Sequence, residues 1–141
     1  MAKVFWDTNL FIYLFEDHPV LGRRVEELQS RMVRRGDRLF TSALTAGEVL
    51  VGALTANDAA LAARYQDFFA SAAITVLAFD LKAAPHYARI RQDRAIARPD
   101  AVQLACAAAA EIDLFVTNDD RLTRKVVAGI HFVTSLGAAP I

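Results

Sequence analysis

Four acidic side chains occupy positions where a carboxylate could bind a cation, namely Asp7, Glu48, Asp100 and Asp119. Asp7 directly follows the apolar run VFW, and Asp119 follows LFVTN. Taken singly, each acid could begin a turn, cap a helix or reach an arginine. Taken together, they fall at the ends of elements or on apolar faces, without an obvious basic partner alongside. Their charges would repel one another if the fold brought them into one place.

A hard divalent cation would relieve that repulsion. A ligand set made only of oxygens favours Mg²⁺ or Mn²⁺, and the three histidines match no zinc spacing. Such an ion keeps bound waters, and one of them can attack a phosphodiester. The four acids therefore predict a metal-dependent phosphoryl-transfer site.

Strands and helices are expected to alternate along the chain. Apolar runs predict strands at 3–6, 38–42, 73–79, 113–118 and 130–134. Helical patterns and caps predict helices at 10–15, 21–35, 43–56, 58–69, 80–95, 99–111 and 119–127, with either Asn57 or Asp58 capping the fourth. This order predicts an α/β fold, with a mostly parallel sheet of four to five strands and helices on both faces. Ligands bind outside the carboxyl ends of such strands, where Asp7 and Asp119 are expected.

Glu48 and Asp100 are predicted to lie on helices. The residues three and four positions from Glu48 are mostly apolar, so we expect Glu48 to interrupt a buried face and to need a cationic neighbour. Asp100 lies in the first turn of the helix that Pro99 opens, on the same stripe as Leu104. Its alternative role is to complement the helix dipole.

Composition limits the classes of protein to consider. The chain has 141 residues, enough for one domain, and we expect a single domain over 1–141. No run reaches the roughly 18 apolar residues that cross a bilayer, and the amino terminus shows no secretory leader. The only cysteine, Cys106, cannot form an internal disulfide. We expect a cytoplasmic protein without membrane contact. Its 16 basic and 16 acidic residues balance, so nucleic-acid binding would need local patches.

Four segments of the sequence also resemble a known family. In order, VFWDTN, SALTAGEVLVG, RPDAVQLACAAA and LFVTNDDRL resemble the four acidic motifs of PIN-domain ribonucleases, over essentially the whole chain. Length and element order resemble the VapC-type toxins of toxin–antitoxin pairs. The resemblance implies that Asp7, Glu48, Asp100 and Asp119 are catalytic and bind Mg²⁺ or Mn²⁺. It also implies that Asn9 and Thr117 support the first and fourth acids.

The resemblance implies further properties. Family members cleave RNA, are inhibited by a cognate antitoxin protein and commonly form homodimers. Two features depart from the family pattern: Trp6 is bulkier than the usual aliphatic residue, and DRL (120–122) replaces a common Asp-Phe pair. Whether Asp119 or Asp120 is the fourth acid therefore stays open, with Asp119 preferred for its spacing from Thr117.

RNA would need positive charge near the acids. We expect Arg94 and Arg98, the basic residues closest to Asp100 in its preceding sequence, to contact phosphates. Two other functions stay open. One is a PIN nuclease that processes RNA without an antitoxin, and the other is a PIN-fold interaction module that has lost catalysis.

Overall fold

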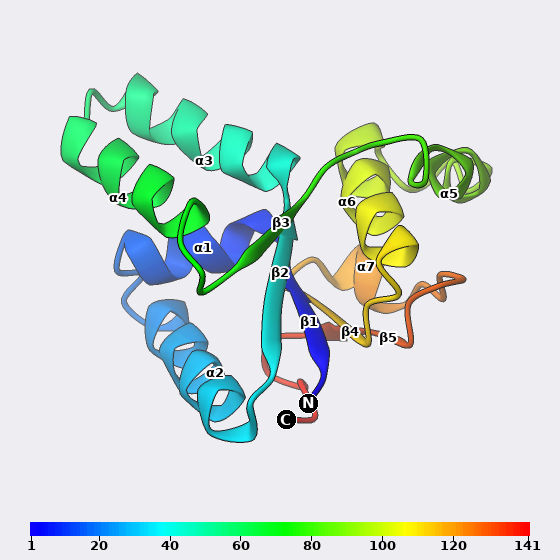
Figure 1. The fold of residues 1–141 in the computed structure, drawn as a ribbon, viewed down its shortest axis with the longest axis horizontal. Coiled ribbons are helices and arrows are strands. Elements are labelled where there is room, and N and C mark those ends of the chain that lie inside the picture. The colour runs from blue at the N-terminus through cyan, green and yellow to red at the C-terminus, as the bar shows by residue number, and fades with distance from the viewer.

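Five parallel strands form one central sheet in the computed structural model, which describes residues 1–141 (Figure 1). The strand order is β3-β2-β1-β4-β5, and all four neighbouring pairs are parallel. The strands are β1 (Lys3–Trp6), β2 (Arg38–Ser42), β3 (Thr75–Leu77), β4 (Leu114–Thr117) and β5 (Phe132–Ser135). The predicted parallel α/β sheet is confirmed, with five strands and with the last strand at an edge.

Seven helices cover the two faces of the sheet. They are α1 (Thr8–Phe15), α2 (Leu21–Arg35), α3 (Ala43–Thr55), α4 (Ala59–Phe69), α5 (Ala84–Ile90), α6 (Arg98–Ala109) and α7 (Asp120–Thr123). In Figure 1, α1 to α4 lie on one side of the sheet and α5 to α7 on the other. None of the helices is both long enough and apolar enough to cross a membrane.

Several predicted ends match local chemistry. The carboxylate of Asp58 accepts a hydrogen bond from the Leu61 N–H at 3.0 Å, so Asp58, rather than Asn57, caps α4. Gly36 ends α2 in the left-handed conformation, with φ of 75°. The Asp58 cap and the Gly36 helix end can be predicted from sequence, because each depends on one residue type at one position.

The predicted helix over 80–95 is too long. Asp80 turns its carboxylate onto the N–H groups of Lys82 and Ala83, which closes a turn ahead of the helix. Pro85 is tolerated only in the first helical turn, so α5 starts beside it and ends at Ile90. The predicted helix over 119–127 is also too long, because α7 stops at Thr123.

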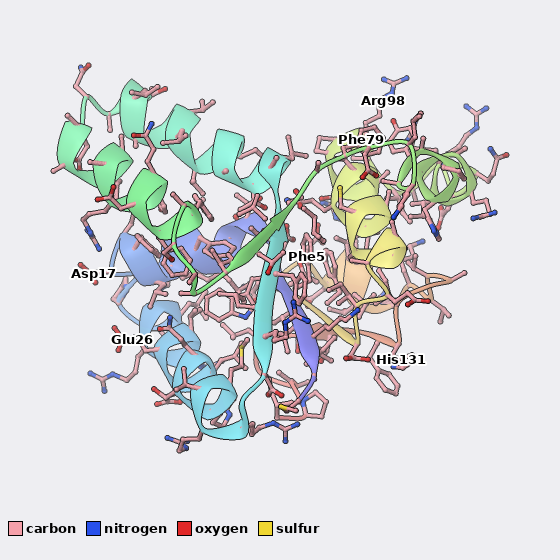
Figure 2. All side chains as sticks on the ribbon, viewed as in Figure 1. Phe5, Asp17, Glu26, Phe79, Arg98 and His131 are labelled. Atoms are coloured by element: carbon pink, nitrogen blue, oxygen red, sulfur yellow. The ribbon has the colours of Figure 1, made fainter.

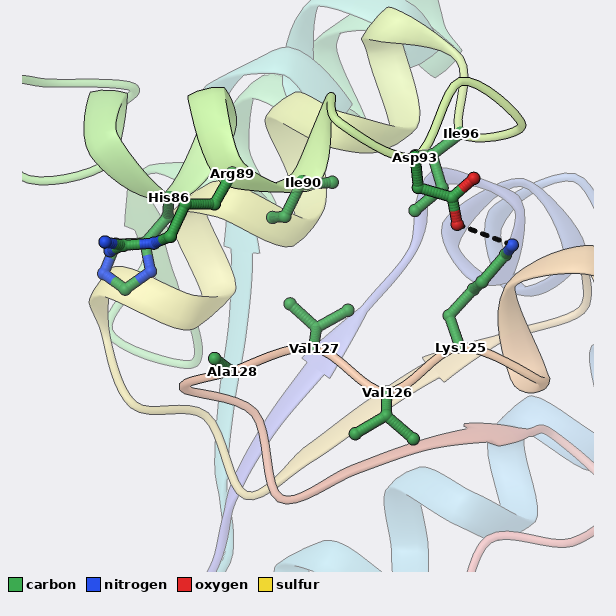
Figure 3. Close-up of a pocket in the computed structure, with 9 residues that line it drawn as sticks. All are labelled: His86, Arg89, Ile90, Asp93, Ile96, Lys125, Val126, Val127 and Ala128. Atoms are coloured by element: carbon green, nitrogen blue, oxygen red, sulfur yellow. Dashed lines mark hydrogen bonds and ion pairs between the residues drawn. The ribbon is translucent and has the colours of Figure 1, made fainter.

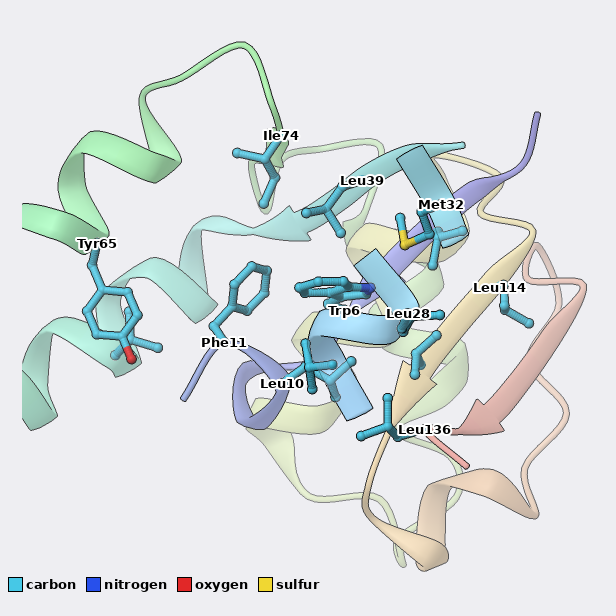
Figure 4. Close-up of a cluster of buried hydrophobic side chains, with 14 of the residues drawn as sticks. Trp6, Leu10, Phe11, Leu28, Met32, Leu39, Tyr65, Ile74, Leu114 and Leu136 are labelled. Carbon is cyan, nitrogen blue, oxygen red and sulfur yellow. The ribbon is translucent and has the colours of Figure 1, made fainter. Parts of the chain in front are cut away.

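The two sides of the sheet have different cores. On the α1–α4 side, Trp6 packs against Phe11 with ring centroids 5.3 Å apart, within a cluster of large side chains (Figure 4). On the α5–α7 side, the core contains fewer large side chains, and α6 contributes mainly buried alanines. Phe5 and Phe115 of neighbouring strands stack there at 4.8 Å. Small side chains let α6 lie close to the sheet, beside the carboxyl ends of β1 and β4.

Candidate active site

A cavity of about 180 Å³ opens beside the carboxyl ends of β1 and β4. Apart from the ring of Pro99, only polar and charged side chains line it. Its walls are Asp7, Thr8, Asn9, Glu48, Pro99, Asp100, Gln103 and Asp119. The four acids predicted from the sequence thus face one cavity, although they come from separate parts of the chain: Asp7 caps α1, Glu48 lies in α3, Asp100 lies in α6 and Asp119 caps α7. Asn9 lies on the same wall.

Pairing between β1 and β4 brings the first and fourth acids together. The Asp7 N–H donates to the Val116 carbonyl at 3.0 Å, which continues the ladder past Trp6. The buried Thr117 hydroxyl then donates to Asp7 Oδ2 at 2.7 Å and accepts from the Asp119 N–H at 3.1 Å. Thr117 therefore links Asp7 to Asp119 through one hydroxyl group.

Asp7 is the most buried of the four acids, with 8% of its surface exposed. Its carboxylate accepts hydrogen bonds from the Thr8 N–H and from Thr117, but no cation is paired with it. Burial raises the pKa of Asp7 in spite of these bonds, and the charges of Asp100 and Glu48 raise it further. The ionised carboxylate is therefore destabilised where it stands.

Behind the acids lies a polar network that the sequence reasoning missed. Gln103, which is 2% exposed, donates through Nε2 to the Thr45 hydroxyl at 2.6 Å and to the Thr8 hydroxyl at 3.0 Å. Its Oε1 accepts from the Ser42 hydroxyl at 2.5 Å. The Thr8 hydroxyl donates to Glu48 Oε1 at 2.8 Å. One amide thus joins β2, α1 and α3 at the back of the cavity.

A signal for this network was present in the sequence. Gln103 is a polar residue among apolar neighbours in α6, and it follows Asp100 by three residues, so both lie on one helical face. Thr45 precedes Glu48 by the same spacing in α3. In both helices, a polar residue stands three positions from the acid, and this spacing could have predicted that Gln103 and Thr45 lie beside the cavity.

The expectation that Glu48 lies on a buried face beside a cation is wrong. Helix α3 turns Thr45, Val49 and Ala53 inward, and Glu48, one position away from that stripe, is exposed. Its partner is the Thr8 hydroxyl rather than an arginine or lysine. Glu48 therefore needs no buried counter-charge.

The expectation that the acids have no basic neighbour is also wrong for Asp119. Arg121 binds both carboxylate oxygens, with Nε 3.0 Å from Oδ1 and a terminal nitrogen 2.7 Å from Oδ2. The pairing with Arg121 lowers the pKa of Asp119. Asp100 differs, because burial and the charge of Asp119 raise its pKa. Asp120 is exposed at the start of α7 and does not line the cavity, whereas Asp119 does.

The donor set suits a hydrated divalent ion more than a bare one. No three acidic, histidine or cysteine side chains are close enough, as they stand, to bind one ion together. The cavity offers only oxygen ligands and amides, and three of its acids repel one another. Mg²⁺ usually keeps several waters and touches few protein carboxylates directly. Such an ion fits the chemistry of these walls.

Arg94 and Arg98 are both exposed, and neither lines the cavity. Arg98 is the first residue of α6, and its side chain extends outward from the helix (Figure 2). Their contact with RNA stays a prediction.

A family model and several solved structures match this chain. The PIN domain model matches residues 4–127. A chain of VapBC2 from Rickettsia felis, bound to a promoter DNA fragment, has a TM-score of 0.76 at 16% identity, covering 94% of this chain and 98% of that one. A chain of DNA-bound VapBC from Salmonella typhimurium has a TM-score of 0.69 at 22% identity, with 96% and 99% covered.

A third solved structure is VapBC-5 from Mycobacterium tuberculosis, with a TM-score of 0.63 at 23% identity, covering 94% of this chain and 98% of that one. At these identities the likeness concerns the fold. Among curated protein sequences, none matches the chain significantly.

Proposed function

Because this chain belongs to the PIN domain family, we propose that it is a metal-dependent endoribonuclease that hydrolyses RNA phosphodiester bonds. We further propose that it is the toxin of a toxin–antitoxin pair. One observation carries the first proposal: carboxylates from four separate parts of the chain line a single cavity. Acids so arranged gain from a cation, and phosphodiester hydrolysis is the chemistry that such a cation serves.

In this proposal, Asp7, Glu48, Asp100 and Asp119 hold Mg²⁺ or Mn²⁺, directly or through water. The ion supplies positive charge for the phosphate and makes a water molecule acidic enough to attack it. Thr117 orients Asp7 toward the cavity, and Gln103 fixes the Thr8 hydroxyl that holds Glu48. Asn9 is the polar residue on the same wall that is free to contact a ligand.

The electrostatics of the walls support cation binding. Burial raises the pKa of both Asp7 and Asp100, so the hydrogen bonds to Asp7 and the charge of Arg121 near Asp100 do not fully compensate the two ionised forms. Only Asp119 forms an ion pair, with Arg121. A bound divalent ion would supply the same counter-charge to Asp119, and the side chain of Arg121, which is 78% exposed, has room to leave the carboxylate.

The toxin assignment draws on the solved relatives. The similar structures are complexes named VapBC, and another similar chain comes from a toxin–antitoxin complex of Klebsiella pneumoniae. By analogy, we propose an antitoxin protein as partner, a homodimer as the assembly, and the cytoplasm as the location. We propose that residues 1–141 act as one PIN-like domain.

The test compares the wild-type protein with Asp7→Asn on a panel of structured RNAs, with Mn²⁺ and with excess EDTA. The wild type should cleave only with the metal, and Asp7→Asn should lose cleavage at least about 100-fold because it removes a central ligand charge. Asp67→Asn is the matched control, since Asp67 is exposed on α4 and does not line the cavity. Full cleavage by Asp7→Asn, or in EDTA, would contradict the mechanism.

The second candidate is an interaction module without catalysis. The Asp119–Arg121 ion pair favours it, because a carboxylate that is already neutralised by an arginine does not need a metal ion. Melting curves recorded during a Mn²⁺ titration separate the two functions: an active site should gain thermal stability with metal, and a silent one should not.

A further inference from the structure

The acid-lined cavity continues into two further hollows. A hollow of about 240 Å³ shares Asp100 with the cavity and also includes Arg121, Arg124 and Lys125. A third hollow, of about 180 Å³, shares Lys125 with the second and lies between α5 and the segment that follows α7 (Figure 3). We call it the side cavity. Because each shares a lining residue with the next, the three hollows are neighbours, and we call the row that they form the path.

The side cavity combines an apolar floor with one basic end. Ile90, Ile96 and Val127 form the floor, each less than a tenth exposed. His86 and Arg89 lie together at one end, and the Lys125–Asp93 ion pair lies at the other (Figure 3). An apolar surface beside a free arginine suits a flat ring attached to a phosphate.

Two arginines along the path are free to bind a ligand. Lys125 is paired with Asp93 at 2.7 Å, an ion pair that joins the two walls of the side cavity. Arg121 is paired with Asp119. These pairs leave the guanidinium groups of Arg89 and Arg124 without a carboxylate partner.

We propose that this path holds a single-stranded segment of RNA beside the phosphate that is cleaved. Arg124 and Arg89 contact backbone phosphates, and the side cavity receives one unstacked base. The acid-lined cavity is itself repulsive to RNA, so the strand needs cations where it leaves the acids, and the path supplies them. Unstacked bases bind by stacking on planar side chains such as histidine rings and guanidinium groups, and His86 and Arg89 supply these at the side cavity. The inference rests on the proposed ribonuclease function and extends it to a substrate-binding subsite.

Binding of a labelled single-stranded RNA of mixed sequence tests the path. All variants are made in the Asp7→Asn protein so that cleavage does not interfere, and affinity is measured by fluorescence anisotropy over a salt series. The double variant R89A/R124A should bind about tenfold more weakly. Its slope of log affinity against log salt should fall by about 1.4, since each lost phosphate contact on a single strand removes about 0.7.

The control R23A/R34A removes the same charge from two exposed arginines on α2. It should leave both affinity and slope near those of the parent. A second probe is V126E, because Val126 is 99% exposed at the rim of the side cavity and its replacement does not disturb the core. This negative charge should weaken RNA binding as well. If R89A/R124A binds with the parent's affinity and slope, or if the α2 control weakens binding equally, the path is not the RNA site.

Cleavage by the otherwise wild-type protein separates this inference from the proposed function. If that protein cleaves RNA with Mn²⁺ while R89A/R124A keeps full affinity, only the path is wrong. If it cleaves nothing while R89A/R124A weakens binding, the nuclease function fails and the RNA-binding path stands.

Discussion

The inner wall and the outer rim of the acid-lined cavity hold their acids by different means. On the inner wall, Asp7 and Gln103 bind uncharged partners, and both are buried. The side chains that bond to the Asp7 and Gln103 side chains are 58 to 110 positions away in sequence. On the rim, Asp119 is held by Arg121, only two residues away, in an exposed ion pair.

The difference concerns which contacts can change when a ligand arrives. A buried hydrogen bond between distant segments is costly to break, because the groups left behind remain unpaired away from water. An exposed ion pair contributes little and opens easily. The inner wall thus fixes the shape of the cavity, and the rim can exchange its internal cation for another one.

The largest stability effect is expected on the inner wall. Gln103→Leu leaves the Ser42, Thr45 and Thr8 hydroxyls without their shared partner, at a cost of about 2–3 kcal/mol in the free energy of unfolding. Urea denaturation measures the loss. Gln66→Leu, at an exposed site on α4, serves as the control and should change stability by less than about 0.5 kcal/mol. Equal losses in the two variants would mean that the inner wall is no more rigid than the surface.

A smaller effect of opposite sign is expected at Asp7. Because burial raises the pKa of Asp7 above its ordinary value of 3.8, the ionised form destabilises the fold. Asp7→Asn should therefore melt a few degrees higher than the wild type near neutral pH without metal, equivalent to about 1 kcal/mol.

The pH dependence of the melting temperature tests whether the charge of Asp7 causes this difference. As pH rises from 3.8 through the raised pKa of Asp7, the wild type loses stability that the asparagine variant keeps. The difference in melting temperature should be largest above that pKa and should disappear as pH falls toward 3.8. A difference that stays constant across this range would trace the effect to packing rather than to charge.

The smallest stability effect, and the sharpest test of the rim, is expected for Arg121→Ala. Loss of this exposed ion pair should hardly change the free energy of unfolding. Arg121→Ala should nevertheless bind Mn²⁺ several-fold more tightly than the wild type, because no arginine then competes for Asp119. Isothermal titration calorimetry measures this affinity. Arg124→Ala removes the same charge nearby without touching Asp119 and should raise the affinity less. Equal gains would indicate general electrostatics instead of direct competition.

The sequence predicted the parts of the site that depend on one residue and its immediate context. Asp7 and Asp119 were expected at the ends of neighbouring parallel strands, and both line the cavity there. Arg121 was missed although it stands two residues from Asp119, where an arginine can bind both carboxylate oxygens.

Gln103 was harder to predict, because its partners lie in other elements. A glutamine within an alanine-rich helix indicates a polar contact, but nothing in its own segment identifies the donor, the Ser42 hydroxyl, which is 61 residues away in sequence. Glu48 illustrates the opposite error. Apolar neighbours predicted burial, and only the packing of α3 on Thr45, Val49 and Ala53 determines which face is exposed.

The order of the strands has a consequence for synthesis of the protein. Strand β1 leaves the ribosome first, yet it ends in the middle of the sheet, and the hydroxyl that holds Asp7 comes 110 residues later. A nascent chain can already contain Asp7, Glu48 and Asp100 and still lack β4, which pairs with β1 and supplies Thr117. The four acids can therefore gather around the cavity only after β4 and Asp119 have been synthesised.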